Sequence, residues 1–597
     1  MTSNDVEGFE EPFAAPRYLS YFSLMFDQGA ITYDVLNHEY AGSGTEDDPY
    51  RVTWISEDPR NPMNFPMKRK VVIMGTTAFA TLIVSFTSSA YIGSLSMVIK
   101  HFDVSNEVAT LGLSLFILGF AIGPLIWVSQ HLNPKGTWSD RANAGIGPSQ
   151  RDYWKTNSFF LQLFDHGSFY GELRWCTKYR ITDCAPLLRG CIWLFSSDQC
   201  WGYYLRPIQC KTTRSWTLPV RGDSISRYVH PCARFDEYRG LTLEGPALGP
   251  SIGGFLGSAA GWRWVEGFLA SCTVVCWILM TVLVPETYAP VLLRKRAEKL
   301  TKLTGKYYGS KTDLEKGKIT LTKRLQTALS RPWILLVHEP IVLLFTFYAA
   351  IVYGTLYMLF GAFPVVYEQG RGWSAGQGGL PFLGVMVGIF IGTGYAVFDN
   401  KRFVRVQERH NGFAPPEARL PLCMVSSVAL PIGMFWFAFS NSPSTHWIAS
   451  VAAMVPFGFG IMLIYLGIVN YLLDAYTIYA ASVLAGMSII RYMFGAIFPL
   501  FTTPMYRALG IHWASSIPAF VSVACLPIPF LFYKYGPVIR TRCKYAAESQ
   551  QYMQKIQEAA TSCARTQEES KEFKEKSEPT VHAKSEDLEL QRAVSVH

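Results

Sequence analysis

The chain has 597 residues, of which 49% are hydrophobic and only 17% are charged. A soluble domain usually carries about 25% charged residues, whereas residues 420–473 contain no Asp, Glu, Lys or Arg. This composition excludes a soluble multidomain enzyme. The twelve cysteines form no CxxC pair, so the sequence predicts neither a disulfide framework nor a metal site.

Ten stretches are long and apolar enough to cross a bilayer, which takes about 20 mostly apolar residues per helix. Four of them precede a basic loop and six follow it. In chain order the predicted spans are Val71–Ile99, Val108–Pro134, Gly245–Trp262, Gly267–Pro285, Pro340–Tyr367, Gly372–Phe398, two within 420–473 that divide near Asn441, Ala475–Tyr506 and Ile511–Tyr533.

Lysine and arginine gather in one set of loops. Lys68, Arg69 and Lys70 precede the first span, and the central loop 286–331 holds twelve basic residues against four acidic ones. Because positively charged loops stay in the cytoplasm, we expect both termini and the central loop to be cytoplasmic. This bias accounts for most of the net charge of +9, so the charge indicates no nucleic-acid partner.

These features divide the chain into five parts. Residues 1–67 and 537–597 are polar ends, which we expect to be solvated cytoplasmic segments. Residues 68–285 form an N-terminal helical bundle, 286–331 form the central loop, and 332–536 form a C-terminal six-helix bundle.

Several motifs follow one another in a fixed order. Residues 58–65 read Asp-Pro-Arg-Asn-Pro-Met-Asn-Phe, and residues 245–254 fit the pattern GxxxGPxxGG. Residues 285–293 read Pro-Glu-Thr-Tyr-Ala-Pro-Val-Leu-Leu. Further motifs lie at 119–127, 262–264, 339–340, 353–354, 415–420 and 470–476. Together they resemble the fungal twelve-span drug:proton antiporter branch of the major facilitator superfamily.

The resemblance implies an all-α, polytopic membrane protein of the major facilitator fold, with two six-helix bundles and no enzymatic activity. It also implies a small-molecule substrate, a lipid bilayer around the chain, and no cofactor, since the proton gradient supplies the energy. We expect a monomer in the plasma membrane, with the vacuolar membrane as the alternative.

The glycine-rich motif at 245–254 also has a physical interpretation that does not depend on the resemblance. Gly245, Gly249, Gly253 and Gly254 allow neighbouring helices to pack closely, and Pro250 removes a backbone donor and bends the span. The resemblance implies that this antiporter motif sets how the transport cavity closes. Simple helix packing is the alternative.

Charged groups inside a membrane are expensive and usually functional. Arg491 lies within a predicted span, where it binds an anionic substrate group, forms a structural ion pair, or extends its side chain to a membrane interface. Glu339 opens a span beside Pro340, where it either carries a proton or only begins the helix. Both residues are candidates for the substrate or proton pathway.

Polar and aromatic residues on two spans add further candidates. Asp474 and Tyr471, three residues before it, lie at a predicted cytoplasmic end, where we expect a gate, and Asn470 is a further candidate for the pathway. Tyr353 and Tyr357 are helically spaced, so they either line a cavity or pack in the core. An aromatic cavity with few fixed charges suits bulky apolar or cationic organic compounds.

Residues 129–240 do not fit this scheme. They never run more than nine residues without a charge, yet the resemblance places spans three and four here, so both spans are disrupted. One hypothesis is an out-of-frame segment: with permitted codons, the shifted frame of 186–204 reads Arg-Phe-Phe-Gly-Gly and that of 227–231 reads Asp-Met-Tyr-Thr, as in the family. The alternative is a real cytoplasmic insertion.

The sequence as a whole predicts proton-coupled efflux of small organic compounds, such as drugs, toxins or secondary metabolites, by alternating access. One alternative is a proton-coupled nutrient importer of the same fold. The disrupted segment 129–240 keeps a second alternative open, a transport-defective or sensor-like product.

Overall fold

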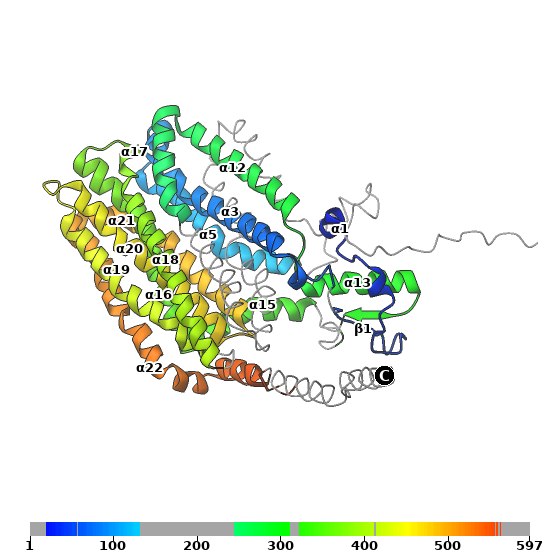
Figure 1. Cartoon of the computed structure of the whole chain (residues 1–597). Coiled ribbons are helices and arrows are strands. Elements are labelled where there is room, and N and C mark those ends of the chain that lie inside the picture. The colour runs from blue at the N-terminus through cyan, green and yellow to red at the C-terminus, as the bar shows by residue number, and fades with distance from the viewer. Residues whose placement is uncertain are drawn as a thin grey trace, which may run out of the picture.

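The computed structural model describes residues 20–55, 58–131, 244–310, 321–410 and 414–555, together with positions 314, 557, 558 and 562. These parts of the chain are almost entirely helical (Figure 1). The anomalous segment beyond His131 lies outside the described residues, and so do the third and fourth spans of the family that the resemblance places in it and the shifted-frame hypothesis.

The N-terminal half holds the first four predicted spans. Its first span bends where a short 3-10 turn interrupts the helix, and Gly261, with φ +89°, makes the turn between its last two helices. The helices described here are α3 (Met67–Ala90), η2 (Tyr91–Ser94), α4 (Leu95–Phe102), α5 (Asn106–His131), an unlabelled helix at 244–260, and α12 (Trp262–Leu283).

The C-terminal half holds the other six spans. Gly510, with φ +74°, breaks the longest helix, so the apolar stretch Ala480–Arg542 makes two crossings. Its elements are α15 (Leu321–His338), α16 (Pro340–Phe363), η6 (Pro364–Gln369), α17 (Ala375–Gly378), α18 (Pro381–Arg409), η7 (Pro416–Arg419), α19 (Leu420–Ser440), α20 (Trp447–Ala475), α21 (Ala480–Cys525) and α22 (Pro527–Arg542).

Seven helical stretches of the described chain are long and apolar enough to cross a membrane. The break at Gly510 divides one of them in two. The shorter apolar helix Asn106–Ile122 and the helix at 244–260 account for the remaining two predicted spans. The prediction of an all-α, polytopic membrane protein is therefore confirmed.

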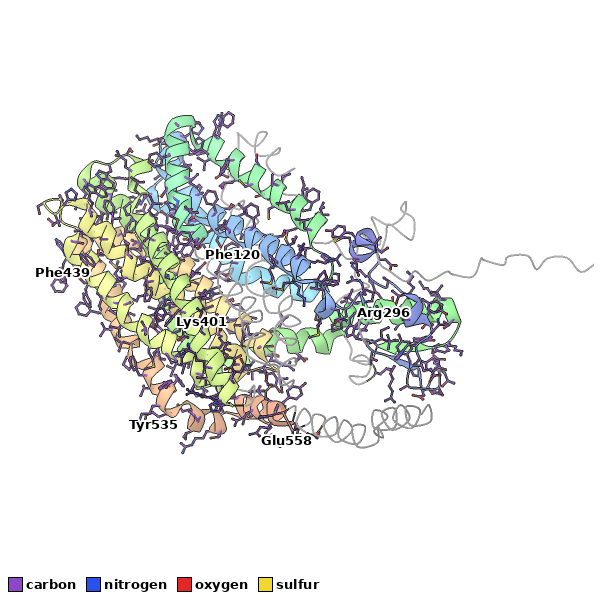
Figure 2. The ribbon with its side chains drawn as sticks, in the orientation of Figure 1. Phe120, Arg296, Lys401, Phe439, Tyr535 and Glu558 are labelled. Atoms are coloured by element: carbon purple, nitrogen blue, oxygen red, sulfur yellow. The ribbon has the colours of Figure 1, made fainter. Side chains whose placement is uncertain are left out.

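The distribution of aromatic side chains indicates which surface lipid covers. Phe439, Trp513 and Phe398 are about two-thirds exposed or more, at 71%, 69% and 68%, and Figure 2 shows Phe439 at the periphery of the C-terminal half. Phe345 and Phe363 are fully buried in the interior of the same half. A monomeric soluble protein rarely exposes such a broad apolar surface, so we expect lipid to cover it.

Residues 20–55 and 58–65 and the beginning of the central loop fold together into a small unit at the end of the molecule where Figure 1 labels α1, α13 and β1. Its elements are α1 (Tyr21–Phe26), α2 (Tyr33–Leu36), β1 (Tyr50–Val52), η1 (Pro62–Asn64), α13 (Ala289–Thr304) and β2 (Tyr308–Ser310). β1 and β2 pair in parallel, with Arg51 opposite Gly309. Val35 and Val52 are fully buried, so our expectation of a solvated segment is wrong for these residues. The apolar face of α13 gives them a surface to cover.

The beginning of the C-terminal tail also differs from our expectation of a solvated segment. Helix α22 ends at Arg542, and the chain continues as a helix over 544–555. Ala546 and Ser549 on this helix are 0% and 1% exposed. The tail therefore begins as a packed element against the C-terminal half.

Candidate functional site

The glycine motif lies directly against the first span. A Cβ atom at Gly249 would overlap the hydroxyl oxygen of Ser89, and one at Gly253 would overlap the carbonyl oxygen of Ala90. A Cβ atom at Gly245 would lie 2.7 Å from the carbonyl oxygen of Leu82. The helix at 244–260 thus approaches α3 so closely that only glycine fits on this face.

The same helix contacts the C-terminal half on its other side. The Ser251 hydroxyl donates a hydrogen bond of 2.8 Å to the Gly379 carbonyl. A Cβ atom at Gly254 would lie 2.7 Å from the Ala375 carbonyl oxygen, and Pro250 lies next to Gly379. The helix at 244–260 continues through Pro250 without a break. The motif therefore forms a seam between the two halves, at the end near α17, away from the termini (Figure 1).

Arg491 is surrounded by aromatic rings. It lies on α21, is 3% exposed, and its guanidinium carbon is 4.8 Å from the ring centroid of Tyr353. The ring centroids of Tyr465 on α20 and Tyr492 on α21 lie 4.8 and 4.7 Å away. Each ring face attracts the cation, and the attraction is stronger where water is excluded.

Tyr353 and Tyr357 extend this cluster toward the N-terminal half. The Tyr353 hydroxyl donates to the Tyr357 hydroxyl at 3.2 Å, and the Tyr357 hydroxyl lies 3.1 Å from that of Ser88 on α3. The Ser88 hydroxyl also lies 2.6 Å from the Ser85 carbonyl oxygen, and either Ser88 or Tyr357 can be the donor in the bond between them. The stripe is buried, and its hydroxyls form a chain of hydrogen bonds across the interface.

Two further contacts join the halves. The rings of Phe120 on α5 and Tyr492 on α21 lie 5.3 Å apart, and Figure 2 shows Phe120 in the interior of the helical assembly. Near the end close to α17, the Asn106 amide donates to the Thr503 hydroxyl at 3.2 Å. Helices α3 and α5 therefore face α16 and α21 along the interface that contains Arg491.

Glu339 lies far from this cluster, at the start of α16. It is 1% exposed, and its two carboxylate oxygens accept hydrogen bonds from the Tyr476 hydroxyl at 2.8 Å and from the Tyr545 backbone N–H at 2.9 Å. Because Tyr545 belongs to the tail, this carboxylate binds the C-terminal segment to the base of the bundle.

The gate candidates lie at the same end as Glu339. Asp474 accepts from Arg419 Nε at 3.2 Å and is about one-third exposed. Tyr471 is fully buried, with its ring 5.2 Å from that of Phe345. Asn470 is 8% exposed on α20. The predicted residues thus separate into an interface cluster and a group at the base of the C-terminal half.

Several residues escaped the sequence analysis. In the sequence, Ser88 and Ser251 look like ordinary helical serines. Their role in the interface becomes visible only from their hydrogen-bond partners in the other half. Glu417 and Arg540 form a buried two-point ion pair at 2.8 and 3.0 Å. Glu244 is 6% exposed and is the first described residue of the helix at 244–260, directly before Gly245, which contacts α3. Its position directly before the glycine motif was the available signal.

The chain is similar to known transporters. The family profile described as Major Facilitator Superfamily matches residues 240–499, beginning where the anomalous segment ends. The "Major facilitator superfamily multidrug transporter mdrA" of Aspergillus fumigatus is 48% identical over 551 residues, covering 91% of this chain and 83% of the relative. The "MFS-type efflux pump MFS2" of Trichophyton rubrum is 47% identical over 568 residues, covering 93% and 87%.

A third relative is the "Efflux pump FUBT" of Fusarium oxysporum, which is 40% identical over 526 residues, with 88% of this chain and 82% of the relative aligned. Identity at this level over most of both chains establishes common descent and a common fold. The chain is therefore a membrane transporter of the efflux type rather than an enzyme, and it belongs to the major facilitator superfamily.

Proposed function

We propose that this transporter exports small organic compounds by alternating access, with the proton gradient as its energy source. Both termini are then cytoplasmic, and the protein acts as a monomer in the plasma membrane. The names of the relatives support export, because they are called a multidrug transporter and efflux pumps. The basic residues of the central loop support the orientation.

One observation carries the proposal: the aromatic and hydroxyl cluster of Arg491, Tyr353, Tyr357 and Ser88 at the interface between the halves. A compound bound there touches both halves at once, so its binding energy differs between the two states of the transporter. Only such a difference allows a ligand to shift a conformational equilibrium. Aromatic faces and one cation suit bulky aromatic molecules with a polar group.

Two buried carboxylates are the proposed proton carriers. Glu244 lies beside the seam of the glycine motif, and Glu339 lies at the base of α16. An ionisable group buried in a span is costly unless it serves a pathway, which supports a role in proton movement. A proton taken up at either site removes the charge and changes which state is favoured.

The test is efflux from yeast cells that lack their own drug exporters and that express this protein from its own cDNA. Cells are loaded with rhodamine 6G, and the release of dye is compared with that of empty-vector cells, with and without a protonophore. We expect faster release that the protonophore abolishes. Absence of export, with the protein present in the plasma membrane, contradicts the proposal. Export that survives collapse of the gradient contradicts proton coupling.

The site is tested in the same assay. Arg491→Lys keeps the charge but loses the flat guanidinium that lies against three rings, so we expect export to fall at least about tenfold. Arg507→Ala on the exposed face of the same helix is the control and leaves export unchanged. Equal export by both variants would show that Arg491 is not part of the substrate site. Glu244→Gln and Glu339→Gln identify the proton carrier, with Glu266→Gln as their control.

A further inference from the structure

Two motifs of the sequence that the transport site does not use meet in the unit formed by residues 20–65, α13 and β2. Asp58 comes from the first motif and Arg296 from the helix that follows the Pro-Glu-Thr motif. They form an ion pair with 0% and 1% of their side chains exposed, and a second contact of 3.2 Å joins Arg296 Nη2 to Asp58 Oδ1. Figure 2 shows Arg296 on α13, beyond the end of α3.

Arg296 is held on several sides. Its Nη2 donates to the Ala30 carbonyl at 3.4 Å, and its guanidinium carbon lies 4.9 Å from the ring centroid of Trp54. Every one of these partners comes from the N-terminal segment. A buried guanidinium is stable only when it is paired and hydrogen-bonded, so this arrangement requires the segment and α13 to stay together.

Arg60 provides a second link between the same two motifs. It is fully buried, and its Nη1 donates to the Glu286 carbonyl at 3.1 Å. The Arg60 backbone N–H donates to Asp58 Oδ1 at 2.9 Å, which orients the carboxylate toward Arg296. Burial lowers the pKa of Arg60 to about 10, although Glu286 opposes the shift, so Arg60 stays charged at neutral pH.

The backbone and a small apolar core complete the connection. β1 pairs with β2 in parallel from Tyr50–Tyr308 to Val52–Ser310. The core beneath the strands combines both segments and consists of Ile31, Val35, Tyr40, Val52, Leu293, Ala297 and Leu300. Residues 20–65 lead into α3, and α13 follows α12 along the chain. Because α3 and α12 pack against each other, the unit joins two segments whose helices are already in contact within the N-terminal half.

We propose that Asp58 and Arg296 are positioning residues of the transport cycle, which fasten the first part of the central loop to the N-terminal half so that the two move as one body. We call this unit, the described residues 20–55 and 58–65 with α13 and β2, the clasp. The chain that must follow the motion between the halves then begins after Ser310 rather than after Pro285. This inference rests on the proposed alternating access, because a static protein needs no such division.

The test separates the clasp from transport. Full-length protein is expressed from its own cDNA, purified into nanodiscs, and β1 and β2 are followed by hydrogen exchange. Asp58→Asn leaves Arg296 buried with a neutral partner, so we expect faster exchange at both strands. Asp27→Asn is the matched control. Asp27 binds Lys299 of the same unit at 2.7 Å, but both side chains are about one-third exposed, so we expect its exchange to match wild type.

Export by the same variants tests the positioning role. At equal abundance in the plasma membrane, we expect Asp58→Asn to lower the maximal export rate at least about threefold while KM changes less than about twofold. A purely structural role would instead lower abundance and leave the rate per molecule unchanged. Faster exchange with an unchanged rate per molecule overturns the proposal, and so does unchanged exchange in Asp58→Asn.

Arg296→Lys is the milder variant for the case in which Asp58→Asn does not reach the membrane. It keeps the charge but loses the two-point contact, and we expect both exchange and export rate to shift in the same directions by smaller amounts. Accelerated exchange with full export again overturns the proposal. The exchange measurement does not depend on transport, so a wild-type protein that exports nothing contradicts the proposed function while the clasp itself can still be observed.

Discussion

Ser88 on α3 and Tyr357 on α16 face each other across the interface between the two halves, with 3.1 Å between their hydroxyl oxygens. Hydrogen bonds join the hydroxyls of Tyr353, Tyr357 and Ser88, and Ser88 Oγ also lies 2.6 Å from the Ser85 carbonyl oxygen. The Arg491 guanidinium lies against the ring of Tyr353. The contact between the halves near Arg491 is therefore polar, and it must break whenever the halves separate.

Ser88→Ala should favour the state in which the halves are apart. The variant removes one buried hydrogen bond, worth about 1 kcal/mol, or roughly a fivefold change in the equilibrium. We expect the KM for exported dye to change by a similar factor, with normal abundance in the membrane. Thr87→Val is the control, because the Thr87 hydroxyl bonds only to the Ile83 carbonyl of its own helix among the described residues. An unchanged KM in Ser88→Ala would show that the contact between Ser88 and Tyr357 does not affect the transport cycle.

Gly249→Ala should disrupt the seam between the helix at 244–260 and α3. The new Cβ atom would overlap Ser89, and the nearest alternative space is occupied by the Ala90 backbone nitrogen at 2.7 Å. Overpacking of this kind costs about 1–3 kcal/mol, so we expect a lower melting temperature in detergent and weak export. Gly267→Ala on α12 meets nothing within 4 Å and serves as the control. Equal melting of the two variants would contradict close packing at the motif.

Hydropathy was sufficient to place the spans, because each needs only a long apolar run, and such runs are visible without knowledge of their partners. The clasp could not be predicted in this way. Asp58 and Arg296 are 238 positions apart, and each reads as an ordinary surface charge in the sequence. The strands that join them are three residues long, too short for any periodicity to indicate.

In the candidate site, too, some features could be predicted from the sequence and others could not. Arg491 and Glu339 were predictable individually, since a charge in an apolar run is costly and therefore conspicuous. Their separation was not predictable, because it depends on how α16 and α21 pack. Ser88 escaped for a different reason. Helical serines usually bond to their own backbone, as Ser88 also does, and nothing in the sequence shows the second partner on α16.

Glu417→Gln should destabilise the base of the C-terminal half. Glu417 on η7 and Arg540 on α22 are 7% and 10% exposed, and they form two parallel contacts. Removing one partner leaves a buried charge unpaired, at a cost of about 3–5 kcal/mol. We expect melting in detergent to begin several degrees lower. Asp48→Asn is the control, because its pair with Arg51 is 3.8 Å long and more than half exposed.

We expect the mature cDNA between the codons for Trp127 and Gly245 to encode two further spans, which sequencing would show. The resemblance requires them between α5 and the helix at 244–260, and an even number of crossings is needed to keep the remaining spans in their orientation. We therefore expect Arg-Phe-Phe-Gly-Gly and Asp-Met-Tyr-Thr to appear in frame, giving twelve spans. A message that encodes residues 129–240 as printed would show that the shifted-frame hypothesis is wrong. The chain would then have ten spans, and its presence in a membrane would have to be measured before any export assay could be interpreted.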